Sequence, residues 1–383
     1  MAKRDSGEGT IVKWDEKKQL FFQRFGYKDK TGKNKVKAIY GKSKGEVNEK
    51  RKAWQKELDA GINTNSAKMT YEAWLRIWLD TYKKGSIEQT TLDNYQQYVT
   101  LHIIPGLGSM KLKDLTRQNI QVFINDMSEK LSSGSVVLIR AIISNSLKIA
   151  VEDDILLKNP ATGIKILKRR VEQTTEIKPF SVEELKTIFS ILGNGKYYNI
   201  AYVAAFTGMR RGEVLGLRWT DIDFSAKIIR VRQQIKYIHS KKELIAGRLK
   251  TENAYREIPL DDKVIAVLKK QSAWQAANKL KLGNAYTDSG LVFTDELGGM
   301  LKPINISVSF GYAVKKAKAG ERSFHDLRHT FASVAISSGV SVKAISATMG
   351  HANIQETLDT YGHLMPGDSY SVTSIVAKYL SCL

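Results

Sequence analysis

The chain has few of the features that stabilise secreted proteins or anchor proteins in a membrane. Its 383 residues include one cysteine, Cys382, which excludes an internal disulfide framework and a zinc site built from cysteines. The N-terminal residues lack the apolar core of a signal peptide, and no run of about 18 apolar residues predicts a membrane span. We therefore expect a soluble protein of the cytoplasm.

Acidic residues are also scarce relative to basic ones. Lys and Arg number 60 against 39 Asp and Glu, which gives a net charge of +21. An excess of this size makes a polyanion the first partner to consider, and nucleic acid leads that list. Residues 1–66 alone carry 17 basic against 9 acidic side chains, a local net of +8, so this segment is a small basic module.

The length exceeds that of one ordinary hydrophobic core and predicts three domains. In the first, residues 1–66, three strand-like runs precede a helical pattern. Val47, Trp54 and Leu58 share one face of that helix and can cover the sheet. The strands are expected around Thr10–Trp14, Leu20–Tyr27 and Lys35–Tyr40, and the helix over Ser43–Ala60.

The second and third domains are predicted to be mainly helical, so the fold class is multidomain α+β. Residues 67–165 form an all-helical domain, residues 166–179 a linker, and residues 180–383 a mainly helical domain with a small sheet. Pro105, Gly106 and Gly108 mark a break between helices of the second domain. Its helices are expected over 69–82, 89–101, 116–131 and 135–152; the third domain has helices over 181–192, 197–206 and 211–217 and strands around 227–238 and 256–259.

Two separated stretches of the third domain carry an arginine near an expected helix start: Thr207–Glu213, with Arg210, and His325–His329, with Arg328. A guanidinium donates paired hydrogen bonds and keeps its proton, so two of them can neutralise charge that builds on one phosphate. Either arginine taken singly is more often an ordinary surface residue. The neighbouring motifs decide between the two interpretations.

A third stretch adds an imidazole and a phenol. The sequence TGxRxxE at 207–213, the sequence HxLRHT at 325–330, and Gly350-His351 followed ten residues later by Tyr361 resemble the three boxes of the tyrosine recombinases, the phage integrase family. Leu249-Lys250-Thr251 resembles the family's lysine on a turn between two strands. Four such elements in the family's order make the resemblance specific.

The resemblance implies that Tyr361 attacks a DNA phosphate, forms a 3′-phosphotyrosyl bond and frees a 5′-hydroxyl, without ATP or a cofactor. A phenol has a pKa near 10, so the attack needs bases and charge stabilisation around it. In the family's scheme Arg210 and Arg328 hold the non-bridging oxygens and Lys250 protonates the leaving oxygen. His325 and His351 bond the phosphate or assist proton transfer, and Glu213 supports Arg210 across one helical turn.

The remaining histidines are interpreted as structural. His329 lies four residues after His325, a spacing that can bind a metal, but the glutamate of an HExxH motif is absent and we expect no metal. His102 and His239 have no companions and are interpreted as ordinary structural or surface residues, and His363, which follows Tyr361, is interpreted as a local helix residue.

The first two domains resemble DNA-binding modules of the same family. Residues 69–165 are similar to the core-binding domain, and residues 1–66 to the arm-site-binding domain, whose sheet enters the major groove. For each basic residue the alternative of an ordinary solvated charge stays open. The candidates for DNA contact are Lys83, Lys84, Arg117 and Arg140 in the second domain and Arg24, Lys35 and Lys37 in the first.

The resemblance also implies partners: double-stranded DNA at core and arm sites, and a homo-tetramer in which the tail after Pro366 docks on a neighbour. An excision factor and DNA-bending proteins are further expected partners. Two alternatives remain. A type IB topoisomerase shares the chemistry, but the separate basic module argues against it, and a DNA-binding regulator with a lapsed site is expected to lack at least one of the box residues, all of which are present.

Overall fold

The computed structural model describes residues 11–28, 34–59, 69–166, 178–249 and 251–362, and it divides the chain into two compact units, 1–173 and 174–383. The first unit contains two separate hydrophobic cores, one within 11–59 and one within 69–166. The second unit carries the motif boxes at 207–213, 325–330 and 350–361. Each part is described by itself.

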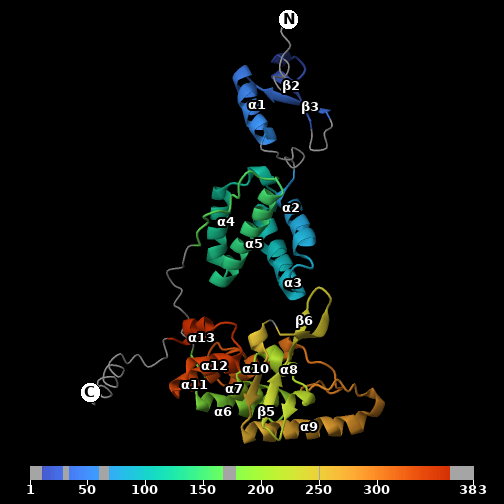
Figure 1. Ribbon diagram of the computed structural model, residues 1–383, viewed down its shortest axis with the longest axis vertical. Coiled ribbons are helices and arrows are strands. Elements are labelled where there is room, and N and C mark those ends of the chain that lie inside the picture. The colour runs from blue at the N-terminus through green and yellow to red at the C-terminus, as the bar shows by residue number, and fades with distance from the viewer. Residues whose placement is uncertain (1–10, 29–33, 60–68, 167–177, 250, 363–383) are drawn as a thin grey trace, which may run out of the picture. The chain divides into compact units, whose positions relative to one another are not determined.

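The N-terminal part is an antiparallel sheet with one helix, as predicted. The sheet has the order β1-β2-β3, and helix α1 packs against β2 and β3 (Figure 1). Phe25 and Ile39 of the sheet and Val47 and Trp54 of the helix form its core, whereas the side chain of Leu58 lies outside the described residues. The elements are β1 (Lys13–Asp15), β2 (Leu20–Lys28), β3 (Asn34–Gly41) and α1 (Lys44–Asp59).

The register of this sheet separates its basic residues. Phe25 pairs with Lys37, and directly opposite residues share a face, so Lys37 lies on the face that α1 covers. Arg24 belongs to the other face, is exposed, and has its guanidinium 5.7 Å from the ring of Phe22. The side chain of Lys35 lies outside the described residues.

The second part, residues 69–166, is all-helical. Its helices begin where the side chains of Thr70, Thr116 and Ser132 accept hydrogen bonds from backbone N–H groups of the first turn, which are otherwise unpaired. The helices are α2 (Tyr71–Ile77), α3 (Gln89–Tyr98), α4 (Arg117–Lys130) and α5 (Ser133–Glu152), and wider π-type turns extend α2 over Trp78–Lys83 and α3 over Val99–Gly108.

The break expected at Pro105 is wrong, because the helical run continues to Gly108 with Pro105 inside it. Proline removes one N–H and crowds the preceding turn, and the wider turns of this segment accommodate both effects. Gly106 has a separate role. A Cβ there would lie 2.5 Å from the ring of Phe123, so glycine allows α4 to pack closely.

Helix α5 is a long, apolar helix. Its 20 residues are long and apolar enough for a membrane span by length and composition alone. One face of the helix, however, is buried in the core of this part with Trp74 and Trp78. Ser146 fixes the contact: its carbonyl accepts the indole N–H of Trp74 at 2.9 Å, and its hydroxyl lies 2.9 Å from the hydroxyl of Tyr71. Helix α5 is therefore the central core helix of this part.

The second unit combines helices with two small sheets. Helix α7 packs against α6, α9, α10 and α11 (Figure 1). One sheet is antiparallel in the order β4-β5-β8, and β6 and β7 form a separate hairpin. The helices are α6 (Val182–Leu192), α7 (Lys196–Thr207), α8 (Arg211–Leu215), α9 (Asp262–Leu282), α10 (Pro303–Lys316), α11 (Asp326–Ser337), α12 (Val342–Met349) and α13 (Ile354–Tyr361); the strands are β4 (Ile222–Asp223), β5 (Ile228–Val231), β6 (Gln233–Ile238), β7 (Glu243–Arg248) and β8 (Arg256–Pro259).

The strand expected around 227–238 is two strands in two different sheets, divided at Arg232. Strand β7 was not expected. Its sequence, ELIAGR, has one β-branched residue and a glycine, so strand propensity alone does not detect it. Pairing with β6 forms it instead.

The contact at Ser146 gives a stability prediction. In S146A the hydroxyl of Tyr71 loses its partner in a buried position, because Ser146 donates its own hydrogen to the carbonyl of Ile143 and accepts from Tyr71. We expect a loss of about 1–2 kcal/mol in the free energy of unfolding, measured by urea denaturation. The control S144A, at a half-buried position on the same helix, should stay within about 0.5 kcal/mol of the wild type. Equal losses in both variants would contradict the assignment.

Candidate active site

Two glycines that end helices direct backbone carbonyls at arginines. Gly208 ends α7 at φ 63° and Gly350 ends α12 at φ 67°, both in the left-handed region that favours glycine. The carbonyl of Gly208 accepts a hydrogen bond from Nη1 of Arg328 at 2.7 Å, and that of Gly350 accepts one from Nη2 of Arg210 at 3.1 Å. The C-terminal ends of α7 and α12 thus present their partial negative charge to these guanidinium groups.

Space also requires glycine at both positions. A Cβ at Gly208 would lie 2.7 Å from the ring of Phe331, and one at Gly350 would lie 2.9 Å from Nη1 of Arg256. The glycines of two sequence boxes therefore have a structural function, which is to place carbonyls against arginines.

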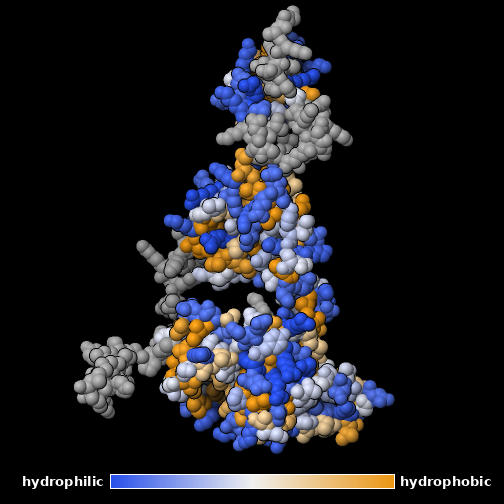
Figure 2. All heavy atoms as spheres, in the orientation of Figure 1, coloured by the Kyte–Doolittle hydropathy of each residue, from blue (hydrophilic) through white to orange (hydrophobic). Residues whose placement is uncertain are grey.

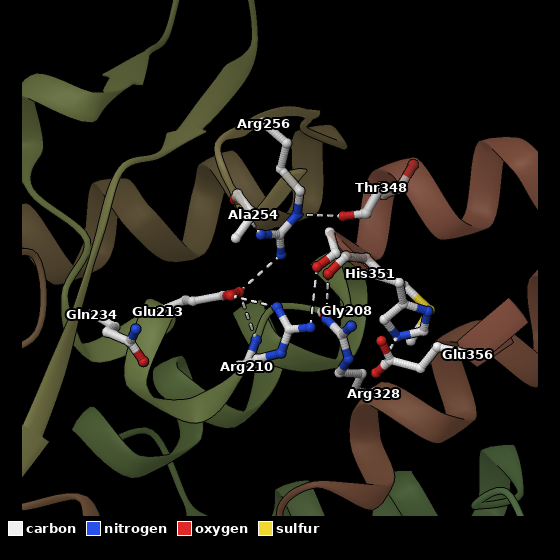
Figure 3. A network of polar contacts seen from close by, with 12 residues as sticks. Gly208, Arg210, Glu213, Gln234, Ala254, Arg256, Arg328, Thr348, His351 and Glu356 are labelled. Atoms are coloured by element: carbon white, nitrogen blue, oxygen red, sulfur yellow. Dashed lines mark hydrogen bonds and ion pairs between the residues drawn. The ribbon is translucent and has the colours of Figure 1, made fainter. Parts of the chain in front are cut away.

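The buried carboxylate of Glu213 joins two of the arginines (Figure 3). It accepts hydrogen bonds from the backbone N–H and Nη1 of Arg210 and from Nη2 of Arg256, each at 2.9 Å. Burial by itself raises the pKa of Glu213, but the charges and hydrogen bonds of Arg256 and Arg210 outweigh it and hold the pKa below its usual value. Glu213 is 2% exposed, whereas the side chain of Arg210 is 35% exposed and remains accessible to a ligand.

Arg256 is a member of this network that the sequence did not single out. It begins β8, and it donates to the carbonyls of Ala254 and Thr348 as well as to Glu213. Its side chain is 5% exposed, so its role is to connect β8, α8 and α12. Arg256 lies six residues after Lys250 in the sequence, close to a motif element. Nothing in the sequence, however, distinguished it from the other basic residues.

Arg328 is the most buried arginine of the site, at 3% exposed. Its Nη1 donates to the carbonyls of Gly208 and Met349, both at 2.7 Å, while its Nη2 has no partner among the described residues. Burial, reinforced by the charge of Arg210, lowers the pKa of Arg328 to about 9, so the group stays a cation at neutral pH. A buried donor without an acceptor costs about 1–3 kcal/mol, and an anionic oxygen is the acceptor that would satisfy it best.

His351 lies beside the arginines and is buried (Figure 3). Its Nδ1 is 2.6 Å from Oγ1 of Thr357, which fixes the ring, and its Nε2 is 3.7 Å from the carboxylate of Glu356. Burial and the charge of Arg328 lower the pKa of His351 to about 4, so the ring is neutral at pH 7. A neutral ring still offers one N–H donor.

His325 stands immediately before α11. The residue is exposed, and its ring meets that of His329 edge-on, with 4.9 Å between the ring centroids. Desolvation by the surrounding chain, then the charges of His329 and Arg328, lower the pKa of His325 to about 4. This ring too is neutral at pH 7.

Tyr361 ends α13 and is 1% exposed. It packs in a small core with Ala332, Ile336, Ile345 and Met349. Its hydroxyl lies 2.6 Å from Nδ1 of His329. Burial raises the pKa of Tyr361 to about 12, even though Arg328 acts in the opposite direction.

The structure thus places the sequence candidates in two linked groups. Arg210, Glu213, Arg328 and His351 share one network of polar contacts, while Tyr361 connects to His325 through His329. Lys250 lies outside the described residues. His329 and Thr357 were missed as functional neighbours, although His329 stands one helical turn after His325. In the described part of the chain, no group of three or more His, Cys, Asp or Glu residues could hold a metal ion.

The DNA-contact candidates of the helical part have partners within the chain. Arg117 donates to the carbonyl of Gly163 at 2.9 Å, and Arg140 to that of Ile164 at 3.3 Å, so both hold the segment after α5. Lys84 pairs with Asp80, and the ammonium of Lys83 lies 5.1 Å from the ring centroid of Trp78. These contacts give Arg117 and Arg140 a structural role that the sequence did not reveal.

A basic cleft in the second unit was not anticipated either. It has a volume of about 520 Å³ and lies between α8, the β6 strand and the start of α10. Arg211, Lys236, His239 and Lys302 line it, and none of its lining residues in the described ranges is acidic. Its electrostatics suit an anionic ligand.

A mainly helical unit with small sheets, which carries the motif arginines, the motif histidines and a tyrosine at the end of a helix, is typical of the tyrosine recombinases. The model of the phage integrase family matches residues 178–367, and that of the N-terminal SAM-like domain of phage integrases matches residues 70–128. A tyrosine recombinase XerC-like protein of Caldanaerobacter subterraneus is 32% identical over 356 residues, which cover 88% of this chain and 90% of the relative. The chain therefore belongs to the phage integrase family of tyrosine recombinases, enzymes of site-specific recombination.

Solved structures show the same fold. The Tn1549 transposon integrase in complex with transposon right-end DNA aligns with a TM-score of 0.66 at 21% identity and covers 82% of this chain and all of its own (100%). A lambda integrase tetramer bound to a Holliday junction aligns with a TM-score of 0.55 at 18% identity and covers 93% of this chain and 96% of its own. At these identities the likeness establishes the fold.

The Glu213 network predicts a costly substitution. E213Q removes the charge that Arg210 and Arg256 share and leaves two cations close together, of which Arg256 is buried. We expect the free energy of unfolding to fall by about 3 kcal/mol at pH 7, measured by urea denaturation. E183Q, at an exposed position of α6, is the matched control and should change it by less than about 0.5 kcal/mol.

The buried charge of Glu213 also predicts how the free energy of unfolding depends on pH. Because the folded pKa of Glu213 lies below its usual value of 4.5, its charge stabilises the fold above that pH, and this contribution is lost as the pH falls through the folded pKa. The difference between wild type and E213Q should therefore be constant above about pH 5 and shrink in more acidic solution. A difference that grows on acidification would contradict the assignment.

Proposed function

We propose that this chain is an integrase that cleaves and rejoins double-stranded DNA through a 3′-phosphotyrosyl intermediate at Tyr361, and so integrates and excises a mobile element. The observation that carries the proposal is the unpartnered buried Nη2 of Arg328 beside the accessible guanidinium of Arg210. Backbone carbonyls fix both groups in place. Together they form a cradle for one phosphate.

Each residue has a part in the proposed step. The phenolic oxygen of Tyr361 forms a bond to phosphorus, the bond to the 5′-oxygen breaks, and Lys250 gives that oxygen a proton. Arg210 and Arg328 bind the non-bridging oxygens, on which negative charge grows in the transition state. His325 and His351, neutral at pH 7, donate hydrogen bonds to the same phosphate. Attack by the freed 5′-hydroxyl of another strand reverses the step and joins the strands.

The described structure holds the nucleophile in an enclosed position. With 1% of Tyr361 exposed, its hydroxyl is closed to solvent and to a DNA strand. The elements that cover the phenol therefore have to open to a DNA strand before attack. Cleavage then depends on that opening.

We further propose domain boundaries and partners. The arm-binding domain spans 1–66, the core-binding domain 67–165, the linker 166–179 and the catalytic domain 180–383, with the protein acting in the cytoplasm. A tetramer on two DNA sites is supported by the lambda integrase tetramer and by apolar side chains exposed on α11 to α13 (Figure 2). The exposed residues are Val334, Val340, Ile354 and Leu358. An excision factor and DNA-bending proteins complete the proposed assembly.

A suicide substrate tests the cleavage chemistry. It is a nicked duplex that carries the core site recovered from the DNA junctions flanking the gene, so that the strand end is lost after attack and the covalent adduct accumulates. We expect the wild type to form an adduct that denaturing gels resolve, and Y361F to form none. Y312F, at an exposed tyrosine of α10, should match the wild type.

Two results would contradict the proposal. One is an adduct in Y361F equal to that of the wild type, and the other is the absence of an adduct from the wild type on every junction tested. Product analysis separates recombination from relaxation of supercoils, since strand exchange between two sites is expected only of a recombinase.

The basic cleft gives a prediction for DNA affinity. If Lys236 and Lys302 neutralise DNA phosphates, K236A and K302A each remove one contact and should lower the slope of log affinity against log salt by about one. Fluorescence anisotropy with core-site DNA at several salt concentrations measures that slope. K269A, at an exposed lysine of α9 that does not line the cleft, is the control and should leave the slope unchanged.

A further inference from the structure

His329 contacts the reacting atom of the proposed nucleophile. Its Nδ1 lies 2.6 Å from the phenolic oxygen of Tyr361, which is within hydrogen-bond distance. The two residues come from different helices, since His329 lies one turn inside α11 and Tyr361 ends α13. No pairing within one helix brings them together, so the contact depends on how α11 and α13 pack around the core of Ile336, Ile345 and Met349.

We propose that His329 is the general base of the cleavage step, which takes the phenolic proton of Tyr361 at Nδ1. The inference rests on the proposed function, because it requires Tyr361 to be the nucleophile. It adds a catalytic residue to the set that the sequence motifs supply.

The proton balance of the step is complete. The O–H bond of Tyr361 breaks and its proton moves to Nδ1 of His329, while the oxygen forms its bond to phosphorus. The bond from phosphorus to the 5′-oxygen breaks, and that oxygen takes a proton from Lys250. On rejoining, the imidazolium of His329 returns its proton to the departing phenolate, so one group serves both directions.

The surroundings of His329 fit a base that works at neutral pH. Burial, and then the charge of Arg328, lower the pKa of the ring, while Asp326 acts in the opposite direction, so the ring is neutral and can accept a proton. His325 faces it edge-on from the preceding turn. The other charged groups near it line an open pocket and come in both signs: Lys178, Glu184, Lys318, Glu321 and Arg322.

That pocket also gives the proton a route to solvent. It has a volume of about 760 Å³, and His329 is one of its lining residues. One edge of the imidazole therefore contacts the enclosed phenol while another part of the ring borders open space. Tyr361, at 1% exposed, has no such route of its own, and its raised pKa of about 12 makes a base necessary near pH 7.

The structure separates this role from that of His325. His325 precedes α11 and stacks on His329, and the hydroxyl of Tyr361 contacts His329. His325 therefore remains free to donate a hydrogen bond to the phosphate. His329 takes the proton of Tyr361 and His325 binds the phosphate, so two histidines one helical turn apart have different roles.

The decisive variant is H329N, compared with H329A in single-turnover cleavage of the suicide substrate. The amide oxygen of asparagine occupies about the place of Nδ1 and accepts the phenolic hydrogen bond, but it cannot take the proton. A general base contributes typically 100- to 10,000-fold, so we expect both variants to cleave at least about 100-fold more slowly than the wild type. Affinity for core-site DNA should stay within about threefold, which shows that both variants fold.

The pH profile distinguishes a base from a structural contact. In the wild type the rate should stay level through the ordinary titration range of histidine and fall only in more acidic solution, where His329 becomes protonated, because burial lowers the pKa of its ring. In H329N and H329A the rate should instead rise about tenfold per pH unit, because only the phenolate then attacks. Imidazole added to H329A should restore part of the rate in proportion to the concentration of its neutral form.

Two outcomes would overturn the inference. If H329N keeps the rate of the wild type while H329A loses it, His329 only positions the phenol. If both variants cleave faster than the wild type, His329 holds Tyr361 in a stored, inactive position. Either outcome, together with loss of the adduct in Y361F, leaves the proposed function intact, whereas an adduct in Y361F refutes both.

A measurement without DNA tests the contact itself. The phenolic hydrogen bond favours the neutral imidazole, so Y361F should raise the pKa of His329, followed by NMR of the histidine-labelled full chain. Y312F should leave it unchanged. An unchanged pKa in Y361F would contradict the hydrogen bond on which the inference depends.

Discussion

The burial of one carboxylate between two arginines is the constraint on which the site depends. Glu213 is 2% exposed and holds Arg210 and Arg256 at 2.9 Å each, and a buried charge is tolerated only when it is paired and hydrogen-bonded. Because Arg256 also donates to the carbonyl of Thr348, the ion pairs connect α8, β8 and α12 into one rigid frame. Arg210 also donates a hydrogen bond to the carbonyl of Gly350, so the network joins segments that lie 140 residues apart in the chain.

The same frame explains why the site retains an unsatisfied donor. Helix-ending carbonyls at Gly208, Met349 and Gly350 satisfy some of the guanidinium N–H groups of Arg210 and Arg328, and Nη2 of Arg328 is left without a partner among the described residues. An unpartnered buried donor lowers the stability of the fold, and in the proposed function a phosphate oxygen of the DNA supplies the missing acceptor. The neutral histidines beside it add donors without adding repulsion between cations.

The sequence predicted what local patterns encode. The helix expected from Thr116 and the spacing of the boxes were accessible because each depends on neighbouring residues. Contacts between distant segments were not accessible. Strand β7 forms by pairing with β6, and the helical run passes through Pro105 because wide turns accommodate the proline. Arg117, expected to contact DNA, donates a hydrogen bond to the carbonyl of Gly163. Arg256 and His329 likewise acquire their roles only when distant elements pack together.

In the proposed function a single tyrosine among the 16 in the chain becomes joined to DNA in the cradle of Arg210 and Arg328. Peptide mapping of the trapped adduct by mass spectrometry tests this directly. After nuclease and protease digestion, we expect one modified peptide, from α13, with a 3′-nucleotide on Tyr361. A nucleotide on any other residue, or on several tyrosines, would contradict it.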